Sequence, residues 1–334
     1  MSNKIILLVL FFIVGLSNSY SKIWTVDNNP GNSGANFTNL QSAHSTASNE
    51  DTIYINGTGL SYGKLTLTKR LIVVGPGYFL GENPFLQANI SSAKIDSVIF
   101  NTGSGGSLIC GLEISFVITN TSNITIMRNW IKSLLSISSN THNITIIQNY
   151  IGIESSYPYK TIEYSDQISN LLISNNYIYG ACGGKHAALT SAITLSNNIM
   201  NTLSSSFIVL EYIRDSNIWN NIIVQGYIYG FSNNSILNNI GNSTQFGTSN
   251  GNQSNVDMST VFINTGSRDG KYRLKTGSPA IGAGVNGEDV GMFGGINPYV
   301  LSGVPPIPSI YFFSAPFGSS VQGLPVRVKI KSNK

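Results

Sequence analysis

The sequence HNITIIQNYI, at residues 142–151, alternates like a β-strand, turns at an asparagine and then resumes as a second strand. The same arrangement returns in SNITIMRNWI at residues 122–131 and in SNLLISNNYI at residues 169–178. Aligning the repeats on the asparagine gives one corner position per repeat: Asn129, Asn149, Asn176, Asn198, Asn221 and Asn239. These positions are separated by 20, 27, 22, 23 and 18 residues, a period that indicates stacked supersecondary units.

Two apolar columns accompany the asparagines. Three residues before the corner stand Ile126, Ile146, Ile173, Leu195, Ile218 and Ile236, and two residues after it stand Ile131, Ile151, Ile178, Met200, Ile223 and Gly241. Four residues before the corner, the side chains are mostly small and polar, as in Thr125, Thr145 and Thr194. This period of two predicts strands whose apolar side faces inward in every repeat.

Each repeat is therefore predicted to contain a strand, a corner of one or two residues held by asparagine, and a second strand. Asparagine tolerates the left-handed backbone of a tight corner, and its amide can bond to the same amide in the next repeat. One repeat cannot bury its apolar face alone, so the repeats are expected to stack as a parallel β-solenoid, about 4.8 Å apart.

At this point the sequence resembles the right-handed parallel β-helix family, the pectate-lyase-like fold, in which asparagine ladders are a familiar feature. The flanks strengthen the resemblance: LIVVGPG at residues 71–77 looks like an early rung, and GSPAIGAG at residues 277–284 with DVG at 289–291 looks like a closing segment. The resemblance covers residues 24–295 and implies an all-β fold. The expected division is a signal peptide at 1–19, the β-helix at 20–295, and a proline-rich linker with a C-terminal strand at 296–334.

The N-terminus predicts export. One lysine precedes an apolar run at residues 5–14, which is too short to span a bilayer, and small residues follow, so cleavage is expected after Ser19. The mature chain is then expected to be secreted, extracellular or on the cell surface, without a transmembrane segment. Its charge of +4, from 19 basic and 15 acidic residues without long basic runs, argues against nucleic acid as a partner. The C-terminal tail is expected to pack along the solenoid or close its end, with a surface-anchoring signal as the alternative.

The two cysteines leave a choice open. Cys110 and Cys182 lie 72 positions apart in an exported chain, where they could form a disulfide. Each stands in an apolar or glycine-rich segment, where a free buried thiol fits equally well.

Catalytic residues are only weakly indicated. Polysaccharide lyases of the resembled fold use Lys or Arg as the base, often with calcium held by clustered acids, whereas hydrolases need two or three close carboxylates. Acidic residues are scattered singly here, without a D-x-D pair among the repeats, so no cofactor is expected and calcium would enter only in a lyase. The three histidines form no metal-ligand pattern. The weak candidates are Lys185 and His186 on a glycine-rich loop, with Arg214, Asp166, Glu211 and Asp215.

A ligand platform is a second possibility. One residue after the corner come Trp130, Tyr150 and Tyr177, and three rings stacked on adjacent repeats would present a face for sugars. Arg128 and Lys132 stand nearby for acidic groups. The alternative is a column packed under a loop, which the isoleucines that continue it favour.

The sequence thus predicts a binding or structural protein that engages a polysaccharide or cell-surface glycan without catalysis. The alternative is a polysaccharide lyase or glycoside hydrolase with its site on a strand face or on the loops around Lys185 and Tyr212. An enzyme should bring Lys or Arg against carboxylates across two or three repeats, whereas a binding scaffold should show an aromatic or polar stripe. Fold-level analogy does not separate them.

Overall fold

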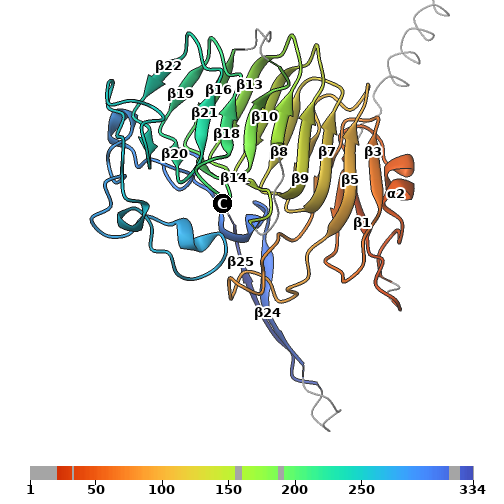
Figure 1. Cartoon of the computed structure of the whole chain (residues 1–334). Coiled ribbons are helices and arrows are strands. Elements are labelled where there is room, and N and C mark those ends of the chain that lie inside the picture. The colour runs from red at the N-terminus through yellow and green to blue at the C-terminus, as the bar shows by residue number, and fades with distance from the viewer. Residues whose placement is uncertain (1–20, 32–33, 155–159, 187–191, 316–323, 334) are drawn as a thin grey trace, which may run out of the picture.

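The computed structural model describes residues 21–31, 34–154, 160–186, 192–315 and 324–333. Long parallel sheets dominate it, with few helices, as expected for a parallel β-helix (Figure 1). The first sheet has ten strands in the order β1 (Ile23–Val26), β2 (Thr52–Ile55), β4 (Ile72–Val74), β6 (Leu108–Cys110), β8 (Ile124–Met127), β10 (His142–Ile147), β13 (Ser169–Ser174), β16 (Ile193–Ser196), β19 (Asn217–Trp219) and β22 (Ser235–Leu237).

The second sheet has thirteen strands and branches at β9 (Trp130–Ile137). β3 (Lys64–Leu67), β5 (Lys94–Phe100) and β7 (Glu113–Thr119) lead up to β9. One arm continues through β11 (Tyr150–Ile151), β14 (Tyr177–Tyr179), β17 (Ile199–Asn201), β20 (Ile222–Ile223) and β23 (Ile240–Gly241), and the other through β12 (Lys160–Tyr164), β15 (Ala181–Gly184), β18 (Ile208–Glu211) and β21 (Tyr227–Tyr229). Beyond β9 the repeat therefore holds up to three strands, where the sequence predicted two.

The register of the sheets follows the apolar columns. Ile126, Ile146, Ile173, Leu195, Ile218 and Ile236 are direct partners from β8 to β22, and all but the last are buried. The column two residues after the corner pairs in the same way along β9 and the β11 arm. Both columns belong to one continuous core that extends from Val26 to Phe246.

The asparagine ladder connects the two sheets at the corner. Each Oδ1 accepts hydrogen bonds from the backbone N–H and the Nδ2 of the preceding ladder asparagine, at 2.8–3.2 Å. All six predicted members are fully buried. Asn252, which sequence alignment missed because it lies in a loop, adds a seventh member that accepts from Asn239 at 2.8 and 3.1 Å.

The ladder asparagine is not the residue that adopts the left-handed backbone, so this part of the prediction was wrong. The residue before it has positive φ in every repeat: Arg128, Gln148, Asn175, Asn197, Asn220 and Asn238, at 52–58°. The two residues of the corner thus have different roles. The first residue turns the chain, and the second directs its amide inward to join the ladder.

The left-handed residues also hold a strap, which we define as residues 283–304. Their side chains bond to strap backbone in reverse order: Asn238 to Ala283 O, Asn220 to Val285 N, Asn197 to Asp289 O, Asn175 to Gly294 O, Gln148 to Pro298 O and Arg128 to Val304 O. The strap therefore runs from the last repeats back toward the early ones. It includes the short helices η3 (Val285–Gly287) and η4 (Leu301–Gly303); η1 (Met258–Thr260) and η2 (Gly270–Tyr272) precede it.

A helix packs on the first strands of the stack, and a hairpin follows the strap. Helix α2 (Leu40–Thr46), N-capped by Asn39, buries Leu40 and Ala43 against the first strands. After the strap, β24 (Ser309–Ser314) and β25 (Arg327–Lys331) form an antiparallel hairpin that projects from the sheets (Figure 1). The tail thus packs along the stack only as far as the strap. The predicted signal peptide lies outside the described residues, within which no helix has the length and apolar character to cross a membrane.

Candidate functional site

The outer face of β12, β15, β18 and β21 brings together polar residues from repeats far apart in sequence. Register pairs Ser136 with Glu163, Glu163 with Gly183, Gly183 with Glu211, and Glu211 with Tyr229. Side chains of one column point to the same side of a sheet. Two carboxylates therefore share a column on either side of a glycine, and a tyrosine follows them.

Glu211 is held by a lysine from two strands away. Lys160 Nζ forms an ion pair with the Glu211 carboxylate and donates to Gly184 O at 2.8 Å. The side chains are only 10% and 2% exposed, so the attraction acts in a low dielectric and offsets part of the desolvation cost. Glu211 is a predicted candidate, whereas the sequence did not indicate Lys160 as its partner.

The predicted base candidates each face a carboxylate. Lys185 Nζ lies 3.4 Å from Glu163 Oε1, which also accepts a hydrogen bond from Ser136 at 2.8 Å. His186 Nε2 lies 3.8 Å from Asp166 Oδ2, and both groups are more than half exposed. Lysine meets carboxylate across three neighbouring strands here, an arrangement that the sequence analysis associated with an enzyme.

Arg214 and Asp215 lie outside this column. Arg214 forms a backbone bridge with Ser232, and Asp215 takes a left-handed backbone where Asn233 donates to its carboxylate. Both residues belong to a turn after β18. The three acidic candidates Asp166, Glu211 and Asp215 therefore have separate partners: His186, Lys160 and Asn233.

Tyrosines extend the face beyond the ion pairs. On β21, Tyr227 and Tyr229 are 41% and 51% exposed, and the Tyr229 ring lies 5.4 Å from that of Tyr212 in an edge-on arrangement. A cavity of about 320 Å³ adjoins Tyr227 and is lined by hydroxyl and amide groups that include Asn242 and Gln245. The outward alternation of YIY at residues 227–229 is the sequence signal that could have found this stripe.

The predicted sugar platform is largely buried. Tyr150 and Tyr177 stack at 4.6 Å between ring centroids, but they lie in a second apolar cluster that includes Met292 and Tyr299. Both hydroxyls donate to the Glu154 carboxylate, at 3.0 and 2.7 Å. The column packed under a covering segment is thus the alternative that the structure supports, and of its three rings only Trp130 stays partly exposed.

Glu154 is the polar centre beneath that cover. Tyr272 and Lys271 also donate to it, at 2.8 and 2.6 Å. Burial raises the pKa of Glu154, but these hydrogen bonds and those from the tyrosines outweigh it, and the pKa lies below its ordinary value. The cluster joins the aromatic column to η2.

The two predicted cations beside the platform serve other partners. Arg128 is buried, and its guanidinium donates to Gln148 Oε1 at 2.8 Å and to Val304 O at 3.0 Å. Lys132 forms a 3.0 Å ion pair with Glu113. Arg128 is therefore part of the strap attachment, which corrects its assignment to acidic ligands.

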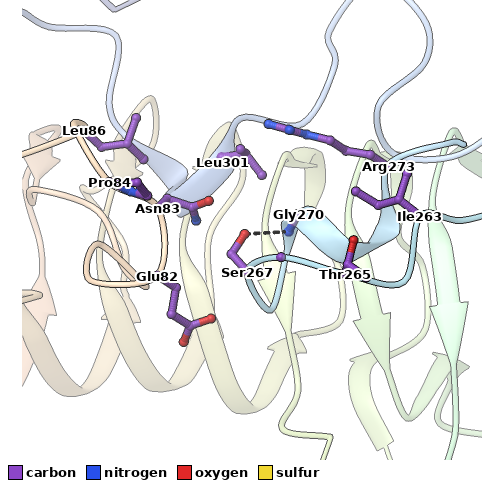
Figure 2. A pocket seen from close by; sticks show the side chains of 11 residues that line it. Glu82, Asn83, Pro84, Leu86, Ile263, Thr265, Ser267, Gly270, Arg273 and Leu301 are labelled. Atoms are coloured by element: carbon purple, nitrogen blue, oxygen red, sulfur yellow. Dashed lines mark hydrogen bonds between the residues drawn. The ribbon is translucent and has the colours of Figure 1, made fainter.

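Two further cavities lie beside residues 263–273, which precede the strap. One of about 390 Å³ is lined by Trp130, Glu154, Arg268 and Lys271. Figure 2 shows the other, of about 440 Å³, between residues 82–86 and 263–273, where Ser267 accepts a hydrogen bond from Gly270 N. In the first cavity both cations are paired, Arg268 with Glu82 at 3.0 Å and Lys271 with Glu154. The second cavity is lined by Glu82 and by the exposed Arg273.

The two cysteines are free, and the described residues contain no metal-binding cluster. Cys110 and Cys182 are both free and buried, and burial raises the pKa of each to about 12. Cys182 pairs in register with Ile162 and Leu210, so its thiol is a core group. Across the described residues, no group of three or more His, Cys, Asp or Glu side chains could hold a metal ion.

Comparison with known proteins identifies no relative. No family model matches the chain, and neither the curated proteins nor the solved structures include a significant match.

Proposed function

We propose that this chain is a secreted, right-handed parallel β-helix protein of the pectate-lyase-like type that binds a polysaccharide or cell-surface glycan on the outer face of β12, β15, β18 and β21. The observation that carries the proposal is the exposed stripe of Tyr227 and Tyr229 beside paired charges. Tyrosine rings supply flat apolar surface for a sugar ring, and the neighbouring hydroxyl and amide groups supply hydrogen bonds.

The charges on this face favour a neutral glycan. Lys160 and Lys185 are each matched by a glutamate, so neither of these lysines, within the part of the face that the structure describes, is left unpaired for a uronate carboxylate. A calcium-dependent lyase would also need clustered acidic ligands, which the column of Glu163 and Glu211 does not form with other acids. Binding without cleavage is therefore the primary function we infer.

The test is affinity electrophoresis or calorimetry of the mature chain with neutral glucans, mannans and xylans, and with uronate polymers. Binding to a neutral polymer is expected, and Tyr229→Ala should weaken it on the order of 10-fold through lost ring contact. Phe313→Ala, which removes an equally exposed ring on the distant hairpin, is the matched control. Binding confined to uronates, or unchanged in a Tyr227→Ala/Tyr229→Ala variant, would refute the proposal.

A glycoside hydrolase is the second candidate, favoured by one specific observation. Glu163 and Glu211 occupy one column two strands apart, so their backbones are about 9.6 Å apart at the usual strand spacing. Inverting hydrolases place two carboxyl groups about 6.5–9.5 Å apart, a range just below this backbone separation. Gly183, between them, adds no side chain to the column, and a Cβ at this position would lie 1.9 Å from the carbonyl oxygen of Glu211.

Release of reducing ends from the bound neutral polymer decides between the two. The binding proposal predicts no release, and likewise no unsaturated product from uronate polymers with or without calcium. Product formation that Glu163→Gln abolishes without loss of binding would establish the hydrolase.

A further inference from the structure

The hairpin of β24 and β25 stands apart from the sheets, and its base is fixed to the loop between β4 and β5. Ala88 N donates to Ile310 O at 2.8 Å, and Lys331 Nζ donates to Phe85 O at 2.7 Å. Beyond these contacts the two strands project away from the stacked strands (Figure 1). The hairpin is thus presented in a defined direction.

This projecting hairpin exposes apolar side chains. Ile310 pairs with Ile330, and Phe313 with Val328, and all four side chains are 46–64% exposed. A two-stranded ribbon open to water is marginally stable at best, and clustered exposed apolar side chains mark an interaction surface.

Charge separates the tail from the rest of the chain. Residues 301–334 contain four basic residues, Arg327, Lys329, Lys331 and Lys334, and no acidic one. The preceding 300 residues contain 15 basic and 15 acidic residues, so the whole net charge of +4 comes from this tail. Lys329 lies 5.4 Å from the Phe312 ring and Lys331 lies 5.8 Å from the Tyr311 ring, so cations and aromatic rings are interleaved.

The charge also discriminates between possible occupants. A second copy would bring two cationic hairpins together without acidic partners, and like charges oppose that contact. An anionic lipid surface provides an apolar layer that would cover the exposed apolar side chains. It also provides negative charge that would pair with the basic residues. Strands of six and five residues are shorter than the roughly 9–11 residues that a bilayer-crossing strand needs, so the hairpin suits the interface.

We propose that the β24–β25 hairpin docks the protein onto the surface of an anionic phospholipid bilayer. Phe313 and Ile330 enter the boundary between headgroups and acyl chains, while Arg327 and Lys329 contact lipid phosphate and carboxylate groups. The glycan face of β12, β15, β18 and β21 belongs to other strands, so docking and glycan binding are separate functions that fail independently.

The experiment is co-sedimentation of the full mature chain with vesicles of phosphatidylcholine alone or with about 30% phosphatidylserine. Binding is expected only with phosphatidylserine and should weaken as salt rises and the screening length shortens. Arg327→Gln/Lys329→Gln should lower the apparent affinity on the order of 10- to 30-fold, since each charge near an anionic surface contributes about 1 kcal/mol. Lys64→Gln/Arg273→Gln removes two exposed charges outside the hairpin and should leave binding unchanged.

A second variant tests the apolar contribution. Phe313→Ser/Ile330→Ser keeps every charge and should also release the protein from the vesicles, whereas a purely electrostatic contact would survive it. Equal binding to both vesicle types, or an equal loss in the Lys64→Gln/Arg273→Gln control, overturns the proposal. A vesicle-free dimer that Phe313→Ser/Ile330→Ser converts to monomer also overturns it, because a second copy then covers the surface.

Discussion

The corner beside the first sheet and the outer face of β12, β15, β18 and β21 come from the same repeats, yet they use repetition in opposite ways. At the corner every repeat supplies a left-handed residue and then an asparagine, so identical amides stack in one network. On the outer face the column changes from Ser136 to Glu163, Gly183, Glu211 and Tyr229. Uniform positions hold the stack together, whereas the varied column concentrates charge and aromatic surface in one place.

The largest loss of stability is expected from a substitution in the varied column of the outer face. Lys160→Met should lower the free energy of unfolding by about 3–5 kcal/mol, because Glu211 would keep a buried charge without its ammonium partner. Urea denaturation measures the change as a shift of the midpoint at constant slope. The outer face is therefore expected to depend on charge pairing for its stability.

The double variant Lys160→Met/Glu211→Leu is the matched control. Replacing a buried ion pair by apolar groups of similar size is often neutral, so most of the lost stability should return. A double variant as unstable as the single one would show that packing at these positions, and not the unpaired charge, causes the loss.

Repetition also explains how much the sequence could predict. The ladder and its two apolar columns were found because strand, corner and strand follow one another at fixed spacing. The outer column was not, because its members follow the ladder asparagine at variable distance: Glu163 comes 14 residues after Asn149, Gly183 comes 7 after Asn176, Glu211 comes 13 after Asn198 and Tyr229 comes 8 after Asn221. Without an alignment of these loops, Lys160 and Glu211 could not be placed together.

The same limit applies to the covering strap. The aromatic column at Tyr150 and Tyr177 has the outward position of a platform, but Tyr272, 95 positions after Tyr177, bonds to it, and Met292 and Tyr299 of the strap belong to the same apolar cluster. Gln148 and Asn175 gave no local sign that their side chains hold Pro298 and Gly294 backbone. Long-range covering segments are therefore the part of the fold that a repeat pattern leaves unspecified.

Two rows of asparagines, one buried and one exposed, show how much burial adds to the stability that their hydrogen bonds provide. Asn149→Ala should cost about 2–3 kcal/mol, because the buried N–H of Asn129 and the carbonyls of Ile126 and Ile147 lose a partner. Asn143 belongs to an exposed row, where it donates to Asn123 and accepts from Asn170. Asn143→Gly keeps its left-handed backbone accessible and should cost less than about 1 kcal/mol.

Urea midpoints of the two variants give this difference directly. Equal losses would mean that the amide hydrogen bonds contribute the same whether buried or exposed, and burial of the ladder would then not explain why the corner is uniform.

A smaller loss than that of Asn149→Ala is expected at Glu154, which accepts hydrogen bonds from the aromatic column and from η2. Its pKa is lowered in the folded state by hydrogen bonds from Lys271, Tyr177 and Tyr272, against the opposing effect of burial. A lowered folded pKa contributes stability that is present above the unfolded value, about 4.3, and is lost as the pH falls through the folded pKa. Glu154→Gln should therefore destabilise the chain by about 1–2 kcal/mol at pH 6, at the low end of the range for hydrogen bonds to a charged group, because the glutamine amide oxygen still accepts hydrogen bonds.

Chemical denaturation at pH 6 and pH 3 tests the sign. The gap between the wild-type chain and Glu154→Gln should narrow at pH 3, because protonation removes the carboxylate that the substitution has already removed. Asp257→Asn is a useful control, since Asp257 also has a lowered pKa, but its partner Ser259 lies on the surface helix η1 outside the aromatic cluster. If the Glu154→Gln gap stays constant from pH 6 to pH 3, the carboxylate charge does not stabilise the cover, and the tyrosines are held there by packing alone.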